Sequence, residues 1–173
     1  MKLTLGAVRR IGVSIGLLAA LFGVAGAQTL AKPAGPVILS IGGQISQRNV
    51  GEFAEFDAAM LDALKVNQFS TTTPWHKNSV AFSGPSLQSV LNAVGAKGKV
   101  LRMKALNDYE IQVPFDDASE FGPVLARRAD GVELTIRTKG PLFMIYPFDS
   151  KPKLKNDIYY SRSIWQLTKI VVE

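Results

Sequence analysis

Residues Gly140–Glu173 read GPLFMIYPFDSKPKLKNDIYYSRSIWQLTKIVVE, and this stretch decides the fold. It contains an apolar run closed by Pro147, a polar loop rich in lysine and tyrosine, and a second apolar run that leads to Glu173. Short apolar runs bounded by turn residues are typical of buried strands. The stretch therefore predicts a strand, a loop and a second strand. A hydrophobic core does not need a loop this polar and aromatic, so the loop is also a candidate binding site.

Two further stretches have the apolar spacing of helices. Apolar residues recur at helical intervals within Phe53–Leu64, which predicts a first helix. A second predicted helix has its apolar face within Leu87–Val94. Ser86 is placed to cap the N-terminus of this second helix, and Gly95 is placed to end it.

The remaining segments predict more strands than helices. Strands are expected at Val37–Ile41, Phe69–Trp75, Val80–Phe82, Val100–Ala105, Tyr109–Val113 and Leu134–Ile136. Turns are expected at His76–Asn78, Asn107–Asp108 and Asp130–Gly131, while Pro123–Arg128 fits either a short helix or a strand. Because the two helices lie between strands, the sequence predicts an α+β fold, a compact mixed-sheet domain with a few short helices.

The first 27 residues have the features of a cleaved signal peptide. A basic start with Arg9–Arg10 precedes the apolar run Ile11–Val24, and Ala25–Ala27 gives the small-x-small pattern of a cleavage site. An uncleaved anchor is the alternative, but the apolar run is shorter than the roughly 20 residues of a membrane span. A twin-arginine signal fits less well, because Val8 precedes the arginine pair.

We therefore expect export by the general secretion route to the periplasm or the cell exterior, with no stable membrane anchor after cleavage. The chain then divides into a signal peptide at residues 1–27, a linker at residues 28–36 and one domain at residues 37–173.

The composition excludes several classes of site. Cleavage would remove three of the 20 basic residues and none of the 14 acidic ones, so the net charge would fall from +6 to +3. Export and the lack of a clustered basic stripe argue against nucleic-acid binding. The chain has no cysteine and a single histidine, His76. Thiolate metal sites, iron–sulfur clusters, cysteine nucleophiles and multi-histidine zinc or copper sites are therefore excluded.

Five motifs, in order, give the chain a family resemblance over roughly Val37–Glu173. They are FSGPSLQSVLNAVG at Phe82–Gly95, Asn107–Tyr109 followed by Pro114, LARRADGVEL at Leu125–Leu134, GPLFMIYP at Gly140–Pro147, and SIWQLTKI at Ser163–Ile170. Read together, they resemble the molybdopterin-binding domain of the sulfite oxidase family. The resemblance implies a sulfite oxidase-like fold and, in family enzymes, a molybdopterin-dependent oxidoreductase activity.

The departures from the family pattern concern its chemistry. The family holds molybdenum through a cysteine thiolate as well as the pterin, and this chain has no cysteine. The family arginine of the fourth motif falls at Phe143, and the lysine of the fifth motif falls at Trp165. In the family, both cations help to hold the pterin phosphate region or a substrate anion, and aromatic residues cannot replace that charge.

The loop before the last strand supplies most of the candidate ligand-binding residues. Its cations can hold an anion, with Arg162 as a bidentate donor, and its aromatic rings offer stacking surfaces. A solvated basic loop is the alternative interpretation. His76 is added as a polar residue beside Trp75, and two residues are added from the family's turn motif, although all three also fit ordinary turn positions. The candidates are Lys151, Lys153, Lys155, Tyr159, Tyr160, Arg162 and Trp165, together with His76, Asp108 and Tyr109.

These observations favour a binding protein over an enzyme. The adjacent Asp116 and Asp117 are more typical of a turn or helix start than of an acid–base pair, so no catalytic residue is predicted. We expect a non-catalytic exported module that binds a small anionic ligand or an extracytoplasmic partner such as a membrane sensor, with no cofactor and no metal. The alternatives are a molybdopterin-dependent oxidoreductase or cofactor carrier without a cysteine ligand, and a purely structural envelope protein.

Overall fold

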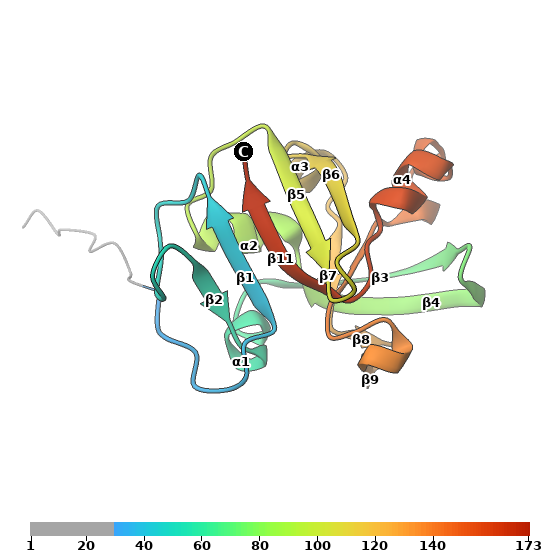
Figure 1. Ribbon diagram of the computed structural model, residues 1–173. Coiled ribbons are helices and arrows are strands. Elements are labelled where there is room, and N and C mark those ends of the chain that lie inside the picture. Colours follow the sequence, from blue (N-terminus) through green and yellow to red (C-terminus); the bar gives the residue numbers. More distant parts are fainter. Residues whose placement is uncertain (1–29) are drawn as a thin grey trace, which may run out of the picture.

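A five-stranded sheet forms the centre of the protein (Figure 1). The computed structural model describes residues 30–173, so the predicted signal peptide lies outside the described residues. In spatial order the strands are β2 (Ala54–Phe56), β1 (Leu39–Gly43), β11 (Leu167–Val172), β5 (Val100–Ala105) and β6 (Glu110–Pro114). The pair β1 and β11 is parallel and the other neighbours are antiparallel. The strand predicted at the end of the chain is therefore confirmed, and it lies in the middle of the sheet.

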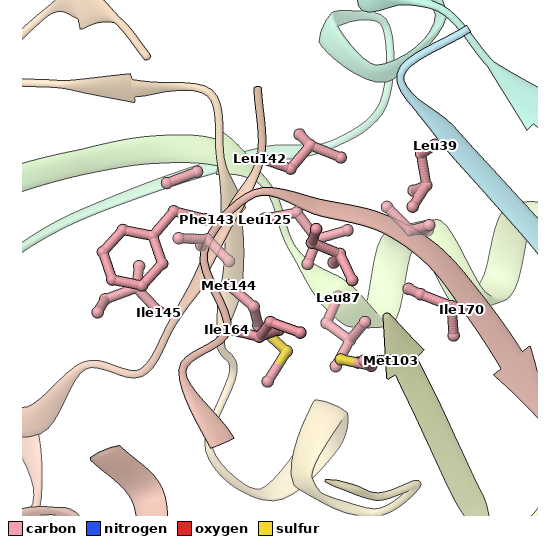
Figure 2. Close-up of a cluster of buried hydrophobic side chains, with 14 of the residues drawn as sticks. Leu39, Leu87, Met103, Leu125, Leu142, Phe143, Met144, Ile145, Ile164 and Ile170 are labelled. Atoms are coloured by element: carbon pink, nitrogen blue, oxygen red, sulfur yellow. The ribbon is translucent and has the colours of Figure 1, made fainter. Parts of the chain in front are cut away.

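One face of this sheet is buried and the other is half-exposed, because side chains alternate along each strand. Leu101 and Met103 of β5 are fully buried, whereas Arg102 and Lys104 point to the other face. Helix α2 (Leu87–Ala93) covers the buried face. Figure 2 shows this packing, with Leu87 of α2 among residues of three sheet strands. The labelled residues from those strands are Leu39, Met103 and Ile170.

Both predicted helix positions contain a capped helix. The Ser86 side chain accepts a hydrogen bond from the backbone N–H of Ser89, so the predicted N-cap of α2 is confirmed. Helix α1 (Ala58–Asp62) is capped by Asp57, which accepts from the N–H of Met60. Asp57 also accepts from the N–H groups of Ala34 and Gly35, each at 2.8 Å. Part of the predicted linker is therefore fixed to the domain.

A second group of strands lies beside the central sheet. The four-stranded sheet has the order β3 (Val66–Thr73), β4 (His76–Pro85), β8 (Arg128–Ala129) and β9 (Val132–Glu133). A two-stranded sheet pairs β7 (Val124–Ala126) with β10 (Phe143–Ile145). The long β3–β4 hairpin projects from the body toward the side on which α4 lies (Figure 1). The short helices are α3 (Asp117–Glu120), α4 (Asp157–Arg162) and the 3₁₀ turns η1 (Ile136–Thr138), η2 (Phe148–Ser150) and η3 (Pro152–Leu154). The predicted mixed α+β class is confirmed.

Four local predictions were wrong in part, and the first concerns the loop before the last strand, which contains α4 because Asn156 caps a helical turn there. Phe53–Leu64 was expected to be one helix, but its first residues form β2, because Ala54 and Phe56 pair with β1 and face the core. Leu134–Ile136 was expected to be a strand, but only Leu134 is buried and the chain turns into η1. His76–Asn78 was expected to be a turn, but it begins β4, since the reversal occurs at residues 74–75.

Gly84 lies in β4 at a point where the backbone of β7 passes directly against it. A Cβ atom there would overlap the carbonyl oxygen of Leu125. We expect Gly84→Ala to lower the free energy of unfolding by about 1–3 kcal/mol, because a buried backbone must move. Urea unfolding followed by circular dichroism measures this. Gly35→Ala is the control, since its Cβ meets only ordinary contacts with Asp57. Equal losses from both variants would contradict this interpretation.

Candidate functional site

A pocket of about 400 Å³ opens between three segments that are distant in the sequence. These segments are the tip of the β3–β4 hairpin, the β5–β6 turn, and the end of α4 with the residues that follow it. None of the eight lining residues carries a formal charge. They are Trp75, Asn107, Tyr109, Tyr160, Ser161, Ser163, Ile164 and Trp165.

Trp75 is the centre of the aromatic wall. Its ring meets that of Trp165 edge to face, with 5.8 Å between centroids and an interplanar angle of 83°. It meets Tyr160 in the same way, at 6.2 Å and 81°. Behind the wall, the buried ring of Phe143 lies 5.6 Å from Trp75. Edge-to-face packing stabilises such pairs, so core packing holds the pocket's aromatic walls in place.

Local backbone geometry positions the other pocket residues. At the hairpin tip, the Thr73 hydroxyl accepts from the N–H of Trp75 and pairs with Nδ1 of His76 at 2.8 Å. In the β5–β6 turn, Asp108 has a φ of 65°, a left-handed conformation that short polar residues tolerate. The Asn107 side chain accepts from the N–H of Tyr109 in the same turn. Two tight turns therefore bring Trp75, Asn107 and Tyr109 to the pocket.

Arg162 does not line the pocket and instead binds a buried carboxylate. Its Nη1 donates to Oδ2 of Asp117 at 2.9 Å, and the same oxygen accepts from the hydroxyl of Tyr146 at 2.6 Å. Burial, and then the hydrogen bond to Asp117, raises the pKa of Tyr146 far above its usual value. The guanidinium also lies 5.2 Å from the ring centroid of Tyr159. Arg162 thereby ties the end of α4 to α3.

The three loop lysines also have partners within the chain. Lys153 forms an ion pair with Glu120 at 2.6 Å, and Lys151 donates to the backbone oxygen of Glu120. Lys155 pairs with Asp149 at 2.6 Å. The hydrogen bond from Lys155, with others from Thr72, lowers the pKa of Asp149 to about 2. An anion that binds to Lys153 or Lys155 must therefore compete with a carboxylate already in place.

The candidate residues thus fall into three groups. The structure brings Tyr109, Tyr160 and Trp165 together in the pocket. It places Tyr159, Arg162 and the three lysines outside the lining, around Phe121, Asp117 and Asp149. His76 packs edge to face on Phe82 rather than in the pocket, and Asp108 pairs with Lys104 at 2.8 Å.

The pocket residues absent from the predicted set are Trp75, Asn107, Ser161, Ser163 and Ile164. Trp75 could have been identified from the sequence, since a tryptophan directly before the single histidine and next to a predicted turn suggests a binding residue. Neutral serine and asparagine residues carry no such signal. Only the meeting of the three segments shows that they belong to one site.

His76 should make folding stability depend on pH. Burial lowers the pKa of His76 below its usual value near 6.5, the charge of Lys139 lowers it further, and Asp130 opposes the change. Since the unfolded chain then binds the proton more readily, stability should fall as the pH drops below about 6.5. His76→Gln should lose less stability than the wild-type protein between about pH 7 and about pH 5 in urea unfolding. Identical pH dependence in the two proteins would contradict this assignment.

Comparison with known proteins gives no family assignment. No protein-family model matches the chain. A search of the curated proteins also finds no match. Within residues 30–173, no helix has both the length and the apolar character needed to cross a membrane. In the same residues, no group of three or more histidine, aspartate or glutamate side chains is arranged to hold a metal ion. The pocket is therefore the feature that bears most directly on function, since its lining provides aromatic surfaces and neutral hydrogen-bonding groups.

Proposed function

We propose that this protein is an exported, non-catalytic binding module on a pared-down fold of the sulfite oxidase type. In this proposal the pocket corresponds to the family's cofactor cleft and takes up a small ligand instead of the cofactor. An extracytoplasmic partner, such as a membrane sensor, would respond to the loaded module. The observation that carries the proposal is the contact between Phe143 and Trp165 at the pocket.

Phe143 and Trp165 stand at the positions where the family resemblance predicts cationic residues. Their rings lie 6.3 Å apart between centroids, and both rings contact Trp75. Trp165 lines the pocket, and Phe143 is fully buried behind it. One of these two positions thus lines the pocket, and the other lies directly behind it in the core. This supports the proposed correspondence between the pocket and the cofactor cleft.

The residues around the pocket do not fit a molybdopterin. The chain has no cysteine to supply a thiolate ligand, and the lining residues have no cation for a phosphate. The buried ring of Phe143 fills the place of the family arginine. A molybdopterin-dependent oxidoreductase or carrier stays the alternative that metal analysis tests.

The cations of the loop before the last strand form a second candidate ligand site, called here the basic rim, which consists of Lys151, Lys153, Lys155 and Arg162. Its positive charge favours an anion. There the lysines would have to exchange their present partners, which is possible because exposed ion pairs contribute only about 0–1 kcal/mol. Arg162 is less available, since leaving Asp117 would strand a buried carboxylate. The neutral pocket is therefore the better supported ligand site.

The proposal predicts that pocket and rim variants differ in ligand binding. In a thermal-shift or ligand-observed NMR screen of small molecules, we expect Trp165→Ala to lose the responses of the wild-type protein. The ring of Trp165 is 38% exposed, so its removal should leave the protein folded. Lys153→Gln, which alters the rim alone, should retain those responses. The opposite pattern would place the ligand on the rim, and no response from any protein would contradict the binding function.

A further inference from the structure

From the chemistry of the pocket lining, we infer that the ligand is an uncharged, planar ring system that carries carbonyl-type acceptor atoms. This inference rests on the proposed function, because it names the ligand class for the same pocket. Quinones and flavin-type heterocycles have this chemistry. Three properties of the lining lead to it: the orientation of its rings, the direction of its hydrogen bonds and its lack of charge.

The aromatic walls suit a flat ligand. The ring of Trp75 stands almost perpendicular to those of Trp165 and Tyr160. A planar ring in the pocket can therefore stack on one wall and meet another with its edge, which are the two favourable arrangements of aromatic pairs. Tyr109, half-exposed on the β5–β6 turn, adds a fourth ring at the rim of the pocket.

Three side chains of the lining carry N–H donors. The indole N–H groups of Trp75 and Trp165 can only donate, and the Asn107 amide nitrogen carries two further N–H groups. The hydroxyls of Ser161 and Ser163 already donate to the backbone oxygens of residues 158 and 159, at 2.8 and 3.0 Å, so toward a ligand they can only accept. A ligand that pairs with the indole and amide N–H groups must bring acceptors, and ring carbonyl oxygens are acceptors that lie in the plane of the ring.

A cationic ligand is poorly served in this pocket, and Lys139 beside Trp165 is the cation that an anion would have to use. The nearby cations Lys104 and Arg162 are paired with Asp108 and Asp117. The ammonium of Lys139 lies 5.2 Å from the ring centroid of Trp165, so a cationic ligand would meet a positive charge already on that ring. Since the lining offers no carboxylate or cation of its own, a buried ionic group would lack a partner.

The test uses matched ring probes that differ in charge. Riboflavin is neutral and FMN adds a phosphate to the same ring, menadione is a small neutral quinone, and choline is a cation without a ring. Isothermal titration of the mature protein should show 1:1 binding of riboflavin or menadione. FMN should bind within about threefold of riboflavin, and choline should not bind. Trp165→Ala should weaken binding of the ring probe by about tenfold or more.

Asn107→Asp tests whether the ligand accepts a hydrogen bond from Asn107. The two side chains have nearly the same shape, but the amide donor is replaced by a carboxylate that only accepts. We expect it to weaken ring binding by about tenfold, while circular dichroism stays unchanged. Unchanged affinity in this variant would overturn the inference. Tighter binding of FMN by tenfold or more, lost in Lys139→Gln, would overturn it in favour of an anionic ligand.

Binding of choline, or of small molecules from the screen but of no ring probe, would also overturn the inference and leave the proposed function standing. Absence of any ligand in both the screen and the titrations would instead refute the proposed function and the inference together.

Discussion

Replacing Asp117 with alanine is expected to lower the free energy of unfolding by about 3–5 kcal/mol, because breaking a buried ion pair strands its partner. Asp117 is 4% exposed, and one of its oxygens accepts from both Arg162 and Tyr146. The variant leaves a guanidinium and a buried hydroxyl without their acceptor. Urea unfolding followed by tryptophan fluorescence measures the change. Because Arg162 holds the end of α4, ligand binding beside Tyr160 should weaken as well.

Two further variants test whether the loss of stability comes from the hydrogen-bond network of Asp117, Arg162 and Tyr146 or from mutation of this region in general. Tyr146→Phe removes one hydrogen bond and keeps the ring, so it should cost about 1 kcal/mol. Asp116→Ala removes the neighbouring exposed carboxylate, which makes no side-chain cap hydrogen bond, and should change stability by less than about 0.5 kcal/mol. If Asp117→Ala lowered the free energy of unfolding no more than Asp116→Ala, this network would not stabilise the fold as proposed.

Replacing Phe143 with arginine, the residue that the resemblance expects, should destabilise the protein by more than about 4 kcal/mol. Phe143 is fully buried, and its ring packs against Trp75, Phe82 and Trp165. The guanidinium stays protonated and finds no carboxylate among these rings. Since whole domains are stable by only about 5–15 kcal/mol, a large loss of soluble folded protein is expected. Thermal unfolding and soluble yield measure this.

Phe143→Leu is the matched control, because it reduces volume without introducing a charge and should cost much less. A Phe143→Arg protein of near-native stability would contradict the account. Such a result would mean that a polar space behind the aromatic wall still accepts the family's cation, and the family's anion-binding chemistry would then have to be considered again.

The sequence predicts those elements whose local pattern agrees with their surroundings. Helix α2 is predicted from apolar spacing, the Ser86 cap and Gly95, and all three features are in the structure. The turn at Asp130–Gly131 is predicted from residue types that tolerate positive φ, and both residues have it. Where tertiary pairing competes, the local pattern misleads. Ala54 and Phe56 join the edge of the central sheet, although the apolar spacing of Phe53–Leu64 suggests a helix.

The candidate site is predicted only in part, for a related reason. Aromatic residues such as Tyr160 and Trp165 stand out in the sequence because exposed rings suggest binding. The lysines and Arg162 stand out for their charge, but charge in a sequence does not show which partner a cation has in the fold. Here Lys153 pairs with Glu120, 33 residues away, Arg162 with Asp117, 45 residues away, and Lys155 with Asp149, only 6 residues away. The anion-binding rim stays a prediction.

Native mass spectrometry and metal analysis of the protein purified from its own host test the central claim most directly. The account predicts a bound uncharged organic molecule in the wild-type protein, its loss in Trp165→Ala, and no stoichiometric molybdenum in either. Stoichiometric molybdenum with a pterin in the wild-type protein would contradict the claim that this fold serves as a binding module without the family's cofactor.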